Sequence, residues 1–379
     1  MTPNLADAAA VLRAALSDAG RGLVERESLV ELIALAAVAG EHLLVIGPPG
    51  TAKSEAARRV ARALGGSVFE YLLGRFTEPS EIFGPIDLRK LKEGIVETQT
   101  AGMLPEAEIA FLDEIFLGST AILNTLLALL NERTFRRGAT SVRVPLRVCV
   151  GASNALPDDE ALAAFADRFL LRAFLDPIPD PRLEELLEGG WSLGGARGER
   201  RATMAHLDVL AAAVGSADLA PVRPHLAHAI RVLRKNGVTL SDRRAVKVQR
   251  LVAAAAVMAG RDRPTEADLW PIVVAVATRE GQAAARDALR DVLARSENGS
   301  LAAAAAEASL GPLARAARIA EAGEKALADV PQNPAGEGVE AWRLKLEGIA
   351  REIDAGFTPA SLPASLATVR ARIVEALGR

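Results

Sequence analysis

The residues whose types and spacing best suit chemistry form a glycine-rich loop near the start of the chain. Residues 47–54 read Gly-Pro-Pro-Gly-Thr-Ala-Lys-Ser and directly follow the apolar run 43–46. This order predicts a strand, a tight loop and a helix, an arrangement that turns backbone N–H groups around phosphate oxygens. In such a loop Lys53 adds a positive charge for the phosphates and the hydroxyl of Ser54 holds Mg²⁺. The nucleotide-binding residues that we expect are Gly47, Pro48, Pro49, Gly50, Thr51, Ala52, Lys53 and Ser54, with alanine at position 52 where glycine is usual.

A second apolar run ends in two carboxylates. Residues 109–112 read Ile-Ala-Phe-Leu and are followed by Asp113 and Glu114, as at the end of a buried central strand. Beside a phosphate-binding loop, Asp113 would hold Mg²⁺ and its water shell, and Glu114 would orient and polarise an attacking water. Taken alone, the pattern fits a strand that ends in a solvated acidic turn equally well. The glycine-rich loop upstream favours the catalytic interpretation.

A third apolar run leads to an amide. Residues 148–152 are followed by Ser153 and Asn154. An asparagine at a strand end is able to hydrogen-bond a γ-phosphate or the attacking water, or simply to cap the turn, where asparagine is common. Cys149, inside this run, is best read as a small buried hydrophobe.

An α/β sheet is the natural scaffold for these groups. Strands alternate with helices or loops, which favours a layered sheet with ligands at the carboxyl ends of its strands. We expect shorter hairpin strands at 96–100 and 142–144, and two helices within 4–39 that are separated at 20–22. The strands expected in the main sheet are 42–46, 68–72, 109–112, 147–152 and 170–174.

A proline-rich hinge separates the sheet from a helical remainder. Residues 176–181 read Asp-Pro-Ile-Pro-Asp-Pro, which continues neither a helix nor a central strand. The helices expected after it are 181–188, 203–213, 222–235, 242–259, 265–279, 281–296, 300–329, 338–354 and 364–377. We therefore expect three domains: an α/β core at 1–178, an all-α lid at 179–284 and a helical extension at 285–379.

Composition excludes several other classes of protein. Among 379 residues the net charge is −3 and aromatic residues make up 4%, so generic nucleic-acid binding has no electrostatic support. One cysteine rules out an internal disulfide framework and a thiolate zinc site. We see no secretory signal and no apolar stretch long enough to span a membrane, and expect a cytoplasmic protein.

Taken in order, these motifs resemble an AAA+ ATPase, specifically the MoxR family. The motifs that carry the resemblance are 47–54, Asp113-Glu114, Asn154, 167–169 and 241–243, and the resemblance covers about residues 5–280. The Ala-Lys-Ser ending of the loop and the Ser-Asp-Arg-Arg segment are closest to the RavA-like branch. The resemblance implies a P-loop parallel-sheet core, an all-α lid domain and a helical C-terminal tail. It also likens 77–84 to an insertion that faces the pore of a ring.

The resemblance assigns roles residue by residue. Gly47, Gly50, Lys53 and Ser54 match Walker A, Asp113 and Glu114 match Walker B, and Asn154 falls at sensor 1. Arg168 falls at the arginine-finger position, which reaches the nucleotide of a neighbouring subunit. The alternatives for Arg168 are a salt bridge with Asp167 or Asp176, and Arg133 is a second candidate for the trans-acting arginine. Arg243 falls at sensor 2, with Arg244 as its alternative.

The function implied is Mg²⁺-dependent ATP hydrolysis by a homo-oligomeric ring, a hexamer, that remodels or chaperones a partner protein. Such proteins work with a partner that carries a von Willebrand factor A (VWA) domain. One alternative is a nucleotide-gated scaffold with little hydrolysis, docking through 285–379; Glu114 argues against it. Another is a magnesium-chelatase-like subunit of a metal-insertion motor. A nucleic-acid motor is opposed by the net charge and by the lack of stacking aromatics near the expected hairpin at 138–145, which is locally basic through Arg133, Arg136, Arg137, Arg143 and Arg147.

Overall fold

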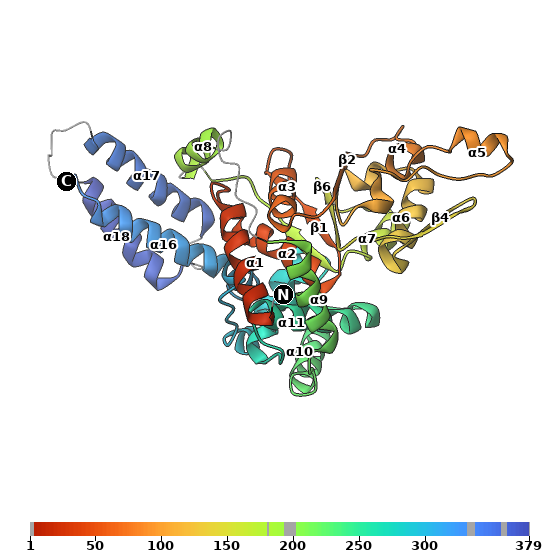
Figure 1. The fold of residues 1–379 in the computed structure, drawn as a ribbon. Helices are drawn as coiled ribbons and strands as arrows, with labels where there is room; N and C mark the ends of the chain where they lie inside the picture. The colour runs from red at the N-terminus through yellow and green to blue at the C-terminus, as the bar shows by residue number, and fades with distance from the viewer. Residues whose placement is uncertain (1–3, 180–181, 193–201, 332–337, 358–361, 379) are drawn as a thin grey trace.

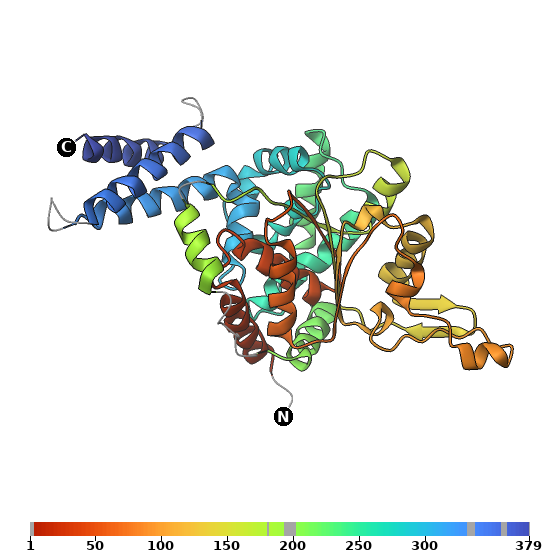
Figure 2. The same ribbon diagram turned by 90° about the horizontal axis from the view of Figure 1, so that it is seen from above.

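A computed structural model describes residues 4–179, 182–192, 202–331, 338–357 and 362–378. A central body carries the main sheet, an arm extends from one side and three helices near the C-terminus extend from the other (Figure 1). The arm contains α4 (Pro79–Phe83), α5 (Leu88–Lys92) and the hairpin of β4 (Thr134–Arg137) and β5 (Thr140–Arg143), and it projects away from the body from above as well (Figure 2).

The main sheet has five parallel strands in the order β2-β3-β6-β1-β7. A parallel sheet is covered on both faces, which explains why its inner strands read as uninterrupted apolar runs. All five strands occur where the sequence predicts them, within two residues at each end. Their bounds are β1 Leu43–Ile46, β2 Val68–Leu72, β3 Ile109–Asp113, β6 Val148–Ser153 and β7 Leu171–Phe174.

The two faces of the sheet bury two separate cores. Leu43 and Val45 of β1 join the core with α1 (Leu5–Gly20), α2 (Glu27–Ala39) and α3 (Lys53–Leu64). Leu44 and Ile46 face the opposite core, built with α6 (Thr120–Glu132) and α7 (Glu160–Ala166). Because alternate side chains of a strand point to opposite faces, both halves of the apolar run are buried.

The expected strand at 96–100 is wrong. Thr98 forms only an isolated bridge with Ile86, and two backbone bonds flank it, from Asp87 to Glu97 and from Gln99 to Pro85. A longer ladder cannot form, because Pro85 has no N–H to donate and the opposing chain turns into α5 at Leu88. The expected strand at 142–144 corresponds to β5, whose partner is β4.

The helical remainder is more broken than the pattern suggests. The expected helix 265–279 is a 3-10 turn (Glu266–Asp268) followed by α12 (Pro271–Val274), and 281–296 divides into α13 (Arg279–Ala288) and α14 (Arg290–Leu293). The expected helix 300–329 breaks at Gly311, whose φ is 52°, before Pro312 begins a new helix. The remaining bounds are α8 Leu183–Ser192, α9 Met204–Ser216, α10 Arg223–Lys235, α11 Asp242–Met258, α15 Ala302–Leu310, α16 Pro312–Ala328, α17 Gly338–Gly356 and α18 Ala364–Leu377, with 3-10 turns at Leu104–Glu106 and Ile115–Leu117.

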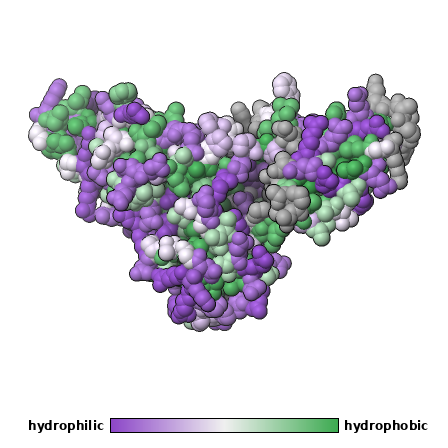
Figure 3. Space-filling model, turned by 180° about the vertical axis from the view of Figure 1, so that it is seen from behind, coloured by the Kyte–Doolittle hydropathy of each residue, from purple (hydrophilic) through white to green (hydrophobic). Residues whose placement is uncertain are grey.

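The lid helices share the core of the body, whereas the last three helices have their own. Side chains of α9, α11, α12 and α15 belong to the same buried cluster as α1 and α2. A separate cluster joins α16, α17 and α18. Among the described residues, no helix is long and apolar enough to cross a membrane. Exposed apolar side chains lie at the outer end of the arm and include Leu88 and Leu91 of α5 (Figure 3).

Candidate nucleotide site

The glycine-rich loop leaves β1 against the end of β7. The Gly47 N–H donates to Ser153 O at 3.1 Å, and a Cβ on Gly47 would lie 2.9 Å from the Cβ of Leu175. Only glycine fits there without displacing β7. Further along, Gly50 and Ala52 both have left-handed backbone, with φ of 77° and 61°. Left-handed residues in such a loop are typical of backbone that turns its N–H groups toward an anion.

Lys53 lies folded over this loop. Its side chain is 7% exposed, and Nζ donates to Gly47 O at 2.6 Å and to Pro48 O at 3.2 Å. A longer contact of 3.5 Å joins Nζ to Oδ1 of Asn154. Burial lowers the pKa of Lys53, while Asp113 and Glu114 oppose that shift. Among the described residues this buried ammonium has no ion-pair partner and is held mainly by neutral carbonyls, which suits a phosphate as its anionic partner.

The expected acidic and amide groups come together at the same edge of the sheet. Asn154 Nδ2 donates to Oε1 of Glu114 at 2.8 Å, and the Glu114 N–H donates to Oδ1 of Asp113 at 3.0 Å. Glu114 has a φ of 49°, so the chain turns sharply where β3 ends. Since β3, β6 and β1 are adjacent parallel strands, their carboxyl ends place Glu114, Asn154 and Lys53 side by side.

The expected metal ligands fit a magnesium–nucleotide site better than an all-protein metal cage. Ser54 follows Lys53 in the first turn of α3 and is half-buried, and Asp113 ends β3. The described residues contain no cluster of three or more His, Cys, Asp or Glu side chains able to hold a metal. Mg²⁺ commonly keeps several waters and takes one or two protein ligands together with substrate phosphates. One hydroxyl and one carboxylate therefore match that requirement.

Arg26 is a buried residue that contacts the glycine-rich loop and that no motif in the sequence indicates. It is 4% exposed, and its guanidinium donates to Thr51 O in the loop at 2.9 Å and to Asp176 O at 2.7 Å. A third bond of 2.8 Å reaches Glu25 O. Burial lowers the pKa of Arg26. An arginine just before a helix carries no signal of such a role, because its partners are backbone carbonyls distant in sequence.

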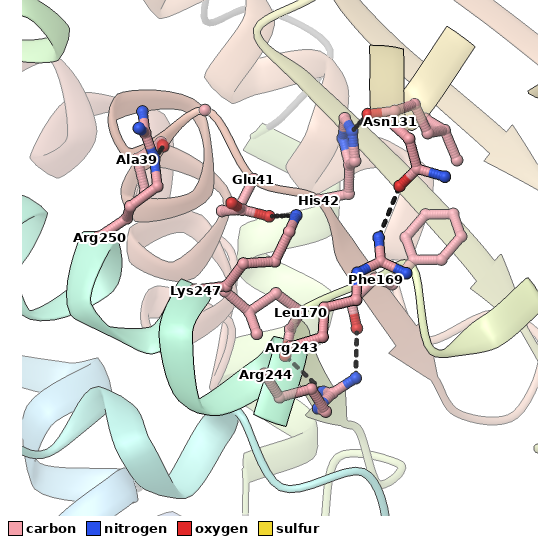
Figure 4. A network of polar contacts seen from close by, with 12 residues as sticks. Ala39, Glu41, His42, Asn131, Phe169, Leu170, Arg243, Arg244, Lys247 and Arg250 are labelled. Carbon is pink, nitrogen blue, oxygen red and sulfur yellow. Dashed lines mark hydrogen bonds and ion pairs between the residues drawn. The ribbon is translucent and has the colours of Figure 1, made fainter. Parts of the chain in front are cut away.

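Arg243 and Arg244 lie at the opposite edge of the sheet. Arg244 is 3% exposed and bonds to Ala275 O at 2.9 Å, to Oδ1 of Asp167 at 2.8 Å and to Leu170 O at 2.6 Å. It thus fastens α11 to the start of β7 (Figure 4). Arg243 donates to Oδ1 of Asn131 at 2.6 Å. The structure therefore brings neither arginine to the glycine-rich loop of its own chain.

The neighbouring contacts show how firmly α11 is held at this amino-terminal edge. Lys247 forms an ion pair of 2.5 Å with Glu41, and Arg250 donates to Ala39 O at 2.8 Å (Figure 4). His42, the residue before β1, contacts Leu130 O through Nε2 at 3.0 Å and accepts the Cys149 N–H at Nδ1. Burial lowers the pKa of His42 well below its ordinary value, so the ring is neutral and structural.

Arg168 lies half-buried at this same edge, without the salt bridges considered for it. Asp167 pairs with Arg244 at 2.8 Å, and Asp176 pairs with Arg279 at 2.9 Å. Nε of Arg168 is buried and has no hydrogen-bond partner among the described residues. Arg133 donates to Gly40 O at 2.7 Å through one nitrogen.

Several guanidinium groups around this edge have unsatisfied hydrogen-bonding capacity. A buried arginine without an anion is costly, and its free N–H groups favour a negatively charged partner. Burial lowers the pKa of Arg172 to about 9, with Arg244 adding to the shift. In the described part of the chain, the buried guanidinium nitrogens without a partner are Nη1 of Arg133, Nε of Arg168, Nε and Nη1 of Arg172, and Nη1 of Arg243.

This combination of fold and site defines an AAA+ protein: a parallel-sheet core with a P-loop, followed by a helical lid. The family model for the MoxR domain of MoxR–VWA–β-propeller ternary systems matches residues 10–212, and the AAA lid domain model matches 218–285. The chain therefore belongs to the MoxR family of AAA+ ATPases.

The chain is also similar to two archaeal proteins in sequence and to one solved structure in fold. Two uncharacterized proteins from Methanocaldococcus jannaschii are 34% identical over 253 residues and 33% identical over 248 residues. Each match covers 65% of this chain, and the chain spans 66% and 64% of those relatives' lengths. A crystal structure of a candidate ATPase from Cytophaga hutchinsonii shares the fold, with a TM-score of 0.60 at 15% identity, and covers 77% of this chain and 96% of its own.

Proposed function

We propose that this chain hydrolyses ATP with Mg²⁺ at sites completed between subunits of a homo-oligomeric ring, a hexamer. The observation that carries the proposal is the separation of two complementary groups. Lys53, Glu114 and Asn154 gather at the carboxyl edge of the sheet, whereas Arg168 and Arg243 lie at the amino edge with unpartnered N–H groups. A second subunit presenting its amino edge would supply the arginines that each P-loop lacks.

Within one subunit the roles follow from position. The loop N–H groups and Lys53 would hold the β and γ phosphates, and Ser54 and Asp113 would hold Mg²⁺. Bound Mg²⁺ would neutralise charge that develops on the phosphates. Glu114 accepts a bond from Asn154 at Oε1, which leaves Oε2 to orient and polarise the attacking water.

Between subunits, Arg168 would act as the arginine finger, because Asp167 and Asp176, the two acids able to pair with it, pair with other arginines. Arg243 would approach the same phosphates from the lid of that neighbour. Arg244 is less suited, since its bonds to Ala275, Asp167 and Leu170 already fasten the lid. Arg133 keeps a free buried nitrogen and remains the second candidate for a trans-acting arginine.

The ring would remodel or chaperone a partner protein together with a VWA-domain protein. The support is the family model, whose description names MoxR–VWA–β-propeller systems. We place the chain closest to the RavA-like branch on its Ala-Lys-Ser and Ser-Asp-Arg-Arg segments. We also propose a core at 1–178, a lid at 179–284 and an extension at 285–379, of which the independently packed part begins at α16.

ATP turnover per subunit, measured against protein concentration, tests this proposal. We expect turnover to rise with concentration and to vanish in Glu114→Gln while that variant still binds nucleotide. Turnover that is independent of concentration down to the monomer would contradict a shared site. ATP binding without turnover at any concentration would favour the nucleotide-gated scaffold, and turnover that requires a metal-insertion partner would favour the chelatase-like alternative.

A further inference from the structure

Asp176 stands where the body, the loop and the lid meet. The chain leaves the sheet here: Leu175 N donates to Ile46 O at 2.8 Å, and the next residue of that neighbouring strand is Gly47. The close approach of Leu175 to Gly47 leaves no room for a side chain on the glycine. The backbone at Leu175 and Asp176 is therefore held against the first residue of the P-loop.

Arg26 connects the far side of the loop to the same point. One nitrogen donates to Thr51 O and another to Asp176 O, at 2.9 and 2.7 Å. A planar guanidinium holds its donors in a fixed geometry. A displacement of Thr51 would therefore be transmitted to the backbone of Asp176.

Arg279 connects the lid to Asp176 from the other direction. It is the first residue of α13, and its Nη1 donates to Oδ2 of Asp176 at 2.9 Å. Nη2 contacts Leu175 O at 3.4 Å, and the guanidinium lies 5.5 Å from the ring centroid of Phe174. A cation at a helix N-terminus opposes the helix dipole, so helix stability does not account for an arginine at this position.

A second residue of α13 strengthens the attachment. Gln282, on the next turn of the helix, is buried, and its Nε2 donates to Arg172 O at 3.1 Å. The first turns of α13 thus lie beside β7 and the two residues that follow it. By contrast, α11 of the same lid is fastened to the amino edge through Arg244. Of these two lid helices, α13 is the one that contacts the P-loop side of the sheet.

The contacts that join Arg26, Asp176 and Arg279 border a cavity of about 330 Å³ between α2, β7, α13 and α15. Arg26, Asp176 and Arg279 line it, together with Arg286 and Glu307. Because all three residues border this hollow, small shifts of their side chains are not blocked by close packing on every side.

We propose that Arg26, Asp176 and Arg279 couple the P-loop to the lid, and that Arg279 is a positioning residue for ATP hydrolysis. The inference rests on the proposed function. A phosphate that reorders the loop would shift Thr51, and Arg26 and Asp176 would pass that shift to Arg279 and α13. In reverse, the lid orientation set by a neighbouring subunit would adjust the loop around Lys53.

The exposure of the ion pair makes a clean test possible. The side chains of Arg279 and Asp176 are 47% and 65% exposed, and exposed pairs contribute little to stability. Arg279→Gln should therefore fold normally. Arg290→Gln is the matched control, because Arg290 forms an exposed pair with Asp287 on the adjacent helix.

We expect Arg279→Gln to lower kcat roughly ten-fold, a size that misplaced catalytic groups readily produce. Its nucleotide affinity and melting temperature should match those of Arg290→Gln. The charge-swapped double variant Arg279→Asp with Asp176→Arg should recover part of the loss. Hydrogen exchange supplies the second readout. A non-hydrolysable ATP analogue should change the exchange of residues 279–288 in the wild type. In Arg279→Gln this change should be lost, while the analogue still protects the P-loop from exchange.

Four outcomes would overturn the proposed coupling between the P-loop and the lid. The first is a rate of ATP hydrolysis in Arg279→Gln equal to that in Arg290→Gln. The second is a change in hydrogen exchange at α13, caused by the ATP analogue, that persists in Arg279→Gln. A parallel loss of affinity and melting temperature would show a merely structural role. If the wild type binds the analogue but hydrolyses no ATP, the proposed function fails while hydrogen exchange still tests the coupling; a chain that binds no nucleotide overturns both.

Discussion

At the scale of single residues, the P-loop departs from the usual pattern at one position with a measurable consequence. Ala52 adopts a φ of 61°, in the left-handed region. Glycine adopts this backbone without strain, whereas the Cβ of any other residue comes too close to the following carbonyl oxygen. The helix that starts at Lys53 begins directly after this strained residue. The chain thus reaches the P-loop shape with alanine, at a cost in conformational energy.

Ala52→Gly tests that strain. Relief of the left-handed alanine should outweigh the extra freedom of the unfolded chain, so we expect a gain of up to about 1 kcal/mol in the free energy of unfolding. Urea denaturation measures it. Ala63→Gly is the control: it lies near the end of the same helix in ordinary helical backbone and should destabilise by about 1 kcal/mol. A loss of stability in Ala52→Gly would show that the loop is not strained.

At the scale of elements, one half-buried carboxylate joins two helices that are far apart in the chain. Glu31 of α2 accepts the Ala304 N–H of α15 at 2.7 Å. Burial raises the pKa of Glu31 to about 7, with Glu27 and Glu307 adding to the shift and the N–H groups of α15 opposing it. We therefore expect the docking of α15 on the body to depend on pH.

The direction of the pH dependence follows from the difference between the pKa of Glu31 in the folded and unfolded chain. Folding favours the protonated form of Glu31, so its stabilising effect is full below the ordinary pKa of 4.5 and is lost as pH rises toward about 7. We expect Glu31→Gln to gain stability over the wild type at pH 8 by up to roughly 3 kcal/mol, and much less at pH 5. Urea denaturation at both pH values measures the difference. Glu188→Gln, at an exposed position on α8, should show no such pH dependence; an equal effect of Glu31→Gln at both pH values would contradict the assignment.

At the scale of the whole molecule, the parallel sheet separates the chemical groups into two edges. The P-loop, Asp113 and Glu114 lie at the carboxyl edge, and Arg168 lies beside the start of β7. One subunit cannot bring both edges to one nucleotide. The proposed ring of like subunits placed head to tail would do so at every interface.

Subunit mixing checks this arrangement. Arg168→Ala retains Glu114, and Glu114→Gln retains Arg168, so each variant alone should be inactive. Mixed one to one, roughly a quarter of the interfaces (one half times one half) should carry both intact groups and restore turnover. Mixing Lys53→Ala with Glu114→Gln is the control, because both lesions then fall on the same side of the interface and no recovery is expected. Absence of recovery in the first mixture would mean that Arg168 does not act in trans.

Much of this architecture follows from local pattern. Apolar runs of four to six residues ending in Ser153-Asn154 or Asp113-Glu114 predict buried parallel strands, because only such strands are apolar on both faces. The same runs place their polar ends at one edge, so the grouping of Lys53, Glu114 and Asn154 is predictable before any coordinate. Helix breaks within Ala-rich segments were harder to locate, since alanine favours helix on either side of Gly311.

Residue type and spacing along single segments are therefore enough to predict the class of fold, the five strands and the groups around the loop. The bonding partners of the arginines, in contrast, depend on how distant segments of the chain pack together. Arg26, Arg244 and Arg279 bond to groups far away in the chain, two of them largely to backbone carbonyls, which no side-chain motif encodes. Tertiary structure also decided that Arg243 lies away from its own P-loop, because the side of the sheet on which a lid helix docks depends on the packing of the whole body.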